Sequence, residues 1–183
     1  MGDLTAHVKA SGRGFAFSSP HTTVNGNVDL ASVKYANDTY KNIKANVNLN
    51  GGNFSAVLSS ANSGCDLSVN CKGALAKDHY AFDANGQIND LDLQRLKLYD
   101  GVCRGRVGFV ASGDFNLKTQ KCDAAINLTG LKWELDSDML VTDKLEGTFA
   151  STDSTVTLDF NNEQTQLAFN STFGPKKLVQ CFK

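Results

Sequence analysis

The sequence has little of what marks the helical, membrane-spanning and nucleic-acid-binding classes. Only two prolines occur in 183 residues, both near the ends, and no apolar run approaches the roughly 20 residues that a transmembrane helix needs. A secretory hydrophobic region is also missing from the start. The 18 basic residues nearly balance the 19 acidic residues, without a basic face interleaved with aromatics, so we expect no nucleic-acid partner. Helical hydrophobic periodicity is almost absent.

Motifs for catalysis or metal binding are lacking as well. The five cysteines form no CxxC pair, which disfavours a zinc site, and the three histidines are isolated from one another. Glu134, Asp136 and Asp138 alternate along a predicted strand, which spaces their carboxylates too widely for one calcium ion. No nucleophile elbow, zinc-protease helix or phosphate-binding loop is present. We therefore expect no enzymatic activity, no metal and no cofactor.

What the sequence does have is alternation of apolar and polar residues from end to end. In Ser154–Thr172, Val156, Leu158 and Phe160 alternate with polar residues, and the pattern resumes after a polar break. Similar segments recur along the chain, separated by clusters of Asn, Asp, Ser and Gly, which is typical of strands joined by tight turns. The pattern predicts an all-β unit of about ten short, mostly antiparallel strands, each with one apolar face, and few or no helices.

Four segments are less regular. Residues 1–23 are predicted to form an edge or a loop. Leu91–Leu98 fits two strand pieces broken at Gln94 better than it fits a helix. Asn48–Asn53 and Asp83–Gly86 have the composition of hairpin turns. No linker or composition shift marks a boundary, so the whole chain, 1–183, is predicted to be one β-rich unit.

Three stretches carry a resemblance to a known family: "DANGQINDLDLQRLKLYDG", "GDFNLKTQKCDAAINLTGLKWELDSDMLV" and "DKLEGTFASTDSTVTLDFN". Together they resemble the TamB branch of the AsmA-like proteins, over roughly Val24 to Phe173. The resemblance implies an elongated, strongly curved sheet forming an open, taco-shaped trough with an apolar inside. It also implies that the chain is a fragment of a longer periplasmic protein of the Gram-negative envelope, anchored in the inner membrane.

Such proteins are thought to conduct phospholipids between membranes or to help assemble outer-membrane proteins with a barrel partner. The leading hypothesis is therefore that phospholipid acyl chains bind by apolar contact alone, because burial of each methylene is worth about 0.8 kcal/mol. The alternative is that the same side chains pack as a dry core. The residues predicted to line the lipid groove are Phe54, Leu58, Leu67, Val69, Phe82, Ile126, Leu128, Phe149, Val156, Leu158, Phe160, Leu167 and Phe169.

A rival hypothesis comes from another functional class. A closed β-sandwich or barrel with exposed aromatics would suit an adhesion or glycan-binding module. The aromatics that favour it are Tyr35, Tyr40, Tyr99 and Trp133.

Overall fold

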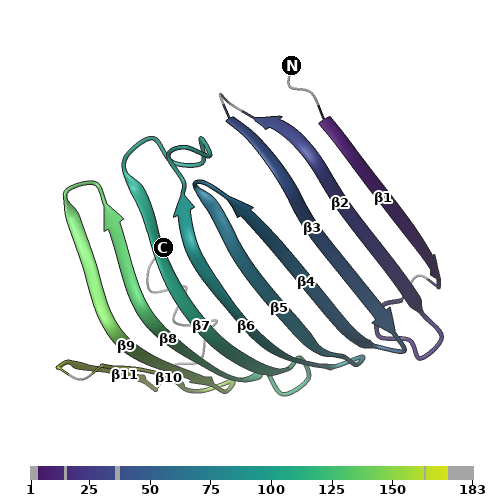
Figure 1. Cartoon of the computed structure of the whole chain (residues 1–183). Coiled ribbons are helices and arrows are strands. Elements are labelled where there is room, and N and C mark those ends of the chain that lie inside the picture. The colour runs from purple at the N-terminus through teal and green to yellow at the C-terminus, as the bar shows by residue number, and fades with distance from the viewer. Residues whose placement is uncertain (1–3, 15, 36–37, 163, 173–183) are drawn as a thin grey trace.

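A computed structural model describes residues 4–14, 16–35, 38–162 and 164–172. These residues form one eleven-stranded sheet in which every strand pairs with its neighbours in the sequence. All ten pairings are antiparallel, and the sheet is open and curved (Figure 1). The strands are β1 (Leu4–Arg13), β2 (Thr23–Tyr35), β3 (Asp38–Asn50), β4 (Asn53–Asn62), β5 (Cys65–Leu75), β6 (His79–Asp92), β7 (Cys103–Asn116), β8 (Lys121–Leu135), β9 (Asp138–Ser151), β10 (Val156–Asn161) and β11 (Gln166–Ser171).

This architecture confirms the predicted all-β fold with its single open antiparallel sheet. No helix occurs among the described residues, and therefore none that is long and apolar enough to cross a membrane. The N-terminal segment that was predicted as edge or loop is an edge strand over β1, followed by a turn-rich connection to β2. Short loops join most other strands, as sequential antiparallel pairing allows.

The register brings rows of apolar residues and glycines together on one face. Residues directly opposite each other on neighbouring antiparallel strands have side chains on the same side of the sheet. Following these partners from strand to strand gives continuous rows that cross the sheet. One such row runs through Val24, Leu49, Phe54, Gly73, Phe82, Gly113, Ala124, Phe149, Leu158 and Phe169.

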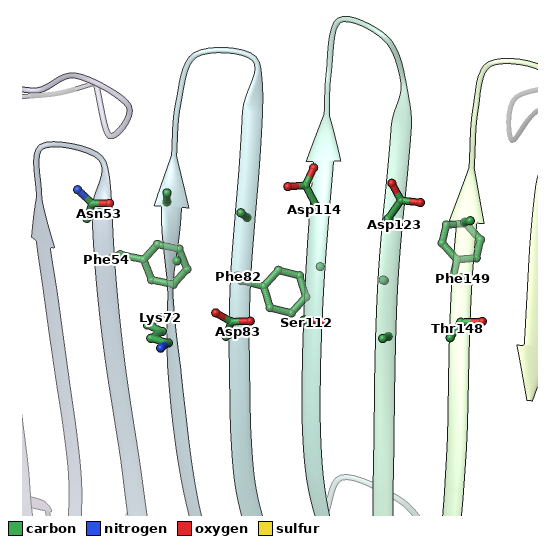
Figure 2. Close-up of a pocket in the computed structure, with 17 residues that line it drawn as sticks. Asn53, Phe54, Lys72, Phe82, Asp83, Ser112, Asp114, Asp123, Thr148 and Phe149 are labelled. Atoms are coloured by element: carbon green, nitrogen blue, oxygen red, sulfur yellow. The ribbon is translucent and has the colours of Figure 1, made fainter. Parts of the chain in front are cut away.

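Aromatic residues in these rows lie against glycines on the next strand. Phe82 is the direct partner of Gly113, and a Cβ added to Gly113 would lie 2.3 Å from the Phe82 ring. Figure 2 shows the Phe54 and Phe82 rings extending sideways from their own strands toward the next one. The ring covers backbone that glycine leaves bare, an arrangement known to support glycines in sheets. The same pairing joins Phe54 to Gly73, Phe109 to Gly86, Trp133 to Gly105 and Phe160 to Gly147.

Two local predictions are wrong. Asp83–Gly86 is not a turn, because β6 runs straight through it and Gly86 receives the ring of Phe109 instead. The second half of Leu91–Leu98 is not a strand: β6 ends at Asp92, and the chain then makes a turn in which the Leu96 amide donates to the Asp92 carbonyl. The carboxylate of Asp92 accepts from the Arg95 amide at 2.8 Å, which favours the turn over a continued strand.

Full burial is confined to a few positions. Val107 and Leu131 are buried on β7 and β8, near the end of the sheet where the 93–101 turn lies. Leu49 and Thr22 are buried near the opposite end, where the β1–β2 connection contacts the Gly51–Gly52 turn. A single sheet without a second layer cannot bury more, because each residue has neighbours only within its own face.

Replacing Gly113 with alanine should lower the free energy of unfolding by about 1–3 kcal/mol, because the new methyl group would force the Phe82 ring aside. Gly26→Ala is the matched control, since the nearest atoms to its Cβ belong to Val47 at 4.0 Å. That change should be neutral or stabilise by at most about 1 kcal/mol. Urea denaturation measures both variants. Equal losses at the two positions would show that the ring contact is unimportant.

Candidate functional site

The thirteen residues predicted to line the groove all lie on one face of the sheet. Their direct partners across the ladders are apolar residues, glycine or serine, with Leu58 opposite Val69 and Leu158 opposite Phe149 as examples. We call the side of the sheet that carries these thirteen residues the apolar face, and the opposite side the polar face. Sequence alternation was sufficient to assign every one of the thirteen residues to its side.

The apolar face extends further than the sequence pattern indicated. Val8 and Ala10 of β1 are the direct partners of Val28 and Gly26 on β2, so the face begins at the first strand. Val8 stands in a segment rich in Gly, Ser and polar residues, which hid the alternation. Phe109 also belongs to the apolar face, where it is the direct partner of Gly86. The alternation of Val107 and Phe109 in the sequence indicates the same side.

Much of the apolar face is exposed. Phe82 is 42% exposed and Leu167 is 60% exposed, whereas Val156 alone among the thirteen is buried. The accessible surface of the chain is 12168 Å², compared with about 8,600 Å² expected for a compact monomer of this mass. Contacts between strands that are not neighbours are few, which is the signature of one layer. No second layer formed by the described residues covers the face.

The polar face carries amides, hydroxyls and charges that bond within the face. Asn48 donates to Asn25 at 2.5 Å, and Asn27 bonds with Asn46 across the same pair of strands. His79 bonds with Asp114 at 2.7 Å. These hydrogen bonds and ion pairs explain why Asn, Ser and Asp recur at alternate positions on the central strands.

A hollow of about 850 Å³ crosses six strands from β4 to β9 (Figure 2). It takes consecutive residues from each strand, such as Ala81, Phe82 and Asp83 on β6. Two of those three belong to the polar face, and the apolar-face residues two positions away, Tyr80 and Ala84, do not line it. The hollow therefore opens on the polar face. Two smaller hollows, of about 380 and 390 Å³, have the same pattern of lining.

Only three of the thirteen predicted groove residues, Phe54, Phe82 and Phe149, contribute to the lining of the 850 Å³ hollow. None of the three hollows described above opens on the apolar face. Its role as a lipid groove therefore stays a prediction.

The titratable side chains of the described residues do not gather into a metal site. Among them no group of three or more His, Cys, Asp or Glu side chains is placed to hold a metal ion. Glu134 pairs with Arg104 at 2.8 Å, while Asp136 accepts from the Val102 amide at 3.0 Å in a turn. The carboxylates of Glu134 and Asp136 are thus engaged separately. Cys65, Cys71, Cys103 and Cys122 are free thiols, and the fifth cysteine, Cys181, lies outside the described residues.

The rival hypothesis loses its structural basis. The described residues form one open sheet, whereas the rival required a closed sandwich or barrel. Tyr40 was expected to be exposed, and this is wrong, because it is 3% exposed between β3 and β4. Trp133 is half-buried against Gly105, while Tyr35 and Tyr99 are exposed at loop ends.

Comparison with known proteins adds no relative. No family model matches the chain, and neither a curated protein nor a solved structure matches it. The resemblance to the TamB branch therefore rests on the sequence stretches quoted above.

The thiol of Cys122, on the apolar face, should titrate at unusually high pH. Burial raises its pKa, and the charges of Asp123 and Asp114 raise it further. Because the thiolate is the reactive form, alkylation of native Cys122 by iodoacetamide should reach half its maximal rate at a higher pH than in the urea-unfolded chain. The neutral thiol is the form that folding favours, so its contribution to stability is lost as pH rises through the native pKa.

Peptide mapping by mass spectrometry reads the alkylation of Cys122 separately from that of the other cysteines. Asp123→Asn should move the half-maximal pH back toward the unfolded value, whereas Asp159→Asn, on the distant strand β10, should leave it unchanged. Identical profiles in the native and unfolded chains would contradict the raised pKa.

Proposed function

We propose that the apolar face holds the acyl chains of phospholipids, and that the chain is a segment of an envelope protein that moves lipids between membranes or assists outer-membrane protein assembly. The observation that carries this proposal is the exposure of a continuous apolar face across all eleven strands. Monomeric soluble proteins rarely expose contiguous apolar patches of more than a few hundred Å², and larger patches mark binding surfaces.

The dimensions of the face suit hydrocarbon chains. Ten strand spacings of about 4.8 Å make each row about 48 Å long along the sheet. One leaflet of a bilayer core is about 15 Å thick, which approximates the length of one acyl chain. A row can therefore accept a chain at several positions along its length. Successive rows lie about 6.7 Å apart along each strand, so an acyl chain lying between two rows would contact both of them.

Hydrocarbon also matches the chemistry of the face. The central rows offer methyl groups, phenyl rings and glycine backbone, with the thiol of Cys71 as a weakly polar exception. A sixteen-carbon chain that buries half its methylenes here would gain about 6 kcal/mol at about 0.8 kcal/mol for each. Binding without fixed polar contacts allows a chain to shift from one position to the next, which transport requires.

The remaining parts of this proposal follow from the resemblance to the TamB branch. They are a periplasmic location, an inner-membrane anchor in the full-length protein and an outer-membrane barrel as a possible partner. The polar face, with its hydrogen-bonded amides, is the side that suits contact with water.

The sharpest test compares two neighbouring residues of β4. Leu58 on the apolar face and Val57 on the polar face are both 40% exposed, so substitution by aspartate places the same charge at equal exposure on opposite sides. Leu58→Asp should weaken binding of a fluorescent sixteen-carbon fatty acid at least tenfold, because it removes apolar contacts and sets a charge among them. Val57→Asp should leave the affinity within twofold of the unchanged protein.

Native mass spectrometry of the purified protein provides the second readout. Co-purifying phospholipid that disappears in Leu58→Asp and persists in Val57→Asp would support the proposal. Equal fatty-acid affinity in both variants would refute it. A lipid-free dimer that dissociates in Leu58→Asp would instead identify a second copy of the chain as the cover of the face. Circular dichroism confirms that both variants keep the sheet.

A further inference from the structure

Strands β3 and β4 separate at one end. Their pairing covers Lys44–Asn50 and Asn53–Ser59, although β3 begins at Asp38 and β4 continues to Asn62. The unpaired half of β3 still pairs with β2, and the unpaired end of β4 still pairs with β5. Figure 1 shows the two strands diverging at this end. We call this unpaired stretch, Asp38–Ile43 facing Ser60–Asn62, the seam.

Side chains replace the missing backbone bonds at the seam. The Asn62 amide accepts from the backbone N–H of Lys41 and donates to its carbonyl, both at 2.8 Å. It therefore acts as the peptide group that β4 does not supply. This single pair of bonds is weaker than a ladder, because a side chain must be ordered to make it.

Tyr40, which belongs to the unpaired half of β3, is buried at a cost. Its side chain is 3% exposed, yet its hydroxyl has no hydrogen-bond partner. Burial raises the pKa of this hydroxyl. A buried polar group without a partner destabilises the closed arrangement, and opening would return the hydroxyl to water.

Arg95, in the turn that follows β6, joins the two sides of the seam. The turn after β6 brings the Arg95 guanidinium to Asp38, with Nε to Oδ2 at 2.8 Å and Nη2 to Oδ1 at 2.6 Å. Nη1 of Arg95 also donates to Ser63 beside the end of β4, at 2.6 Å. One side chain thus joins both sides of the seam in a bidentate geometry that only arginine provides. Gly64 permits this approach, since a Cβ there would lie 2.8 Å from Cδ of Arg95.

We propose that the seam is a hinge and that Arg95 is its latch: the unit β1–β3 opens away from β4 about the intact half of the ladder when Arg95 releases Asp38. Opening uncovers the ring of Tyr40 and frees the first half of β3. The proposal does not depend on lipid binding, because it rests on the contacts of the seam alone.

Amide hydrogen exchange on the unaltered protein tests the hinge directly. The Lys41 amide should exchange through a local opening whose rate barely changes with low urea, while amides in the centres of β7 and β8 should require global unfolding. If the Lys41 amide exchanges only with global unfolding, no hinge exists at the seam.

Arg95→Gln tests the latch, and Arg104→Gln is the matched control. Arg104 forms a comparable ion pair with Glu134 at 2.8 Å, but across two strands that are paired along their ladder. Arg95→Gln should speed exchange of the Lys41 amide at least tenfold and leave the centres of β7 and β8 unchanged. Arg104→Gln should change neither region. Uniform acceleration, or none, in Arg95→Gln would overturn the assignment of the latch.

Tyrosine nitration gives an independent readout. Tyr35 is 46% exposed and serves as an internal reference for Tyr40 in the same protein. In the unaltered protein Tyr35 should be nitrated while Tyr40 is protected, and Arg95→Gln should raise nitration of Tyr40 at least fivefold relative to Tyr35. An unchanged ratio would contradict opening at the seam. If Arg95→Gln does not fold, Arg95→Lys, which keeps the charge without the bidentate geometry, takes its place in both measurements.

Discussion

The structure depends on one constraint: a single antiparallel sheet must be held together by its backbone ladders and by side-chain contacts within each face. Two-layer domains stabilise a sheet by packing another element on its apolar side. Here the described residues supply no such element, and full burial is limited to a few positions such as Leu49 and Leu131. Side-chain contacts along each row therefore replace the contacts that a second layer would make. They do so because an apolar side chain on an inner strand has neighbours on the strands at both sides.

The aromatic–glycine pairs show how this constraint shapes the face. A ring laid over a glycine on the next strand gains contact area without a second layer, and it lies low on the face instead of standing upright. The register also shifts near one end of the sheet, between Asp66 and Leu67 and again between Arg106 and Gly108. Such bulges increase local twist and bend the strands. They lie toward the end of the sheet that contains the 93–101 turn and the seam. The pairing between strands is therefore less regular at that end.

Sequence reasoning recovered what depends on local periodicity and missed what depends on distant contacts. Alternation with a period of two placed all thirteen groove residues on one face, because a strand in a regular ladder has no freedom to rotate its side chains to the other side. The same reasoning failed at Leu96, where the Asp92 carboxylate ends the strand. The rival hypothesis likewise expected Tyr40 to be an exposed aromatic, whereas it is buried. Both errors lie beside the seam, where contacts between residues as distant as Asp38 and Arg95 decide the structure.

Under the proposed function, the two faces would meet the two requirements of a phospholipid, an apolar surface for its chains and water for its headgroup. A sheet only one layer thick would offer both within the thickness of a strand. The apolar rows cross the strands, so an acyl chain lying along a row would point toward the edges of the sheet rather than toward the loops. Its headgroup would then lie over the face or beyond an edge strand. Apolar residues of both edge strands are among the more exposed on the face, with Val8 of β1 at 64% and Leu167 of β11 at 60%, so under the proposed function an acyl chain could enter from either side.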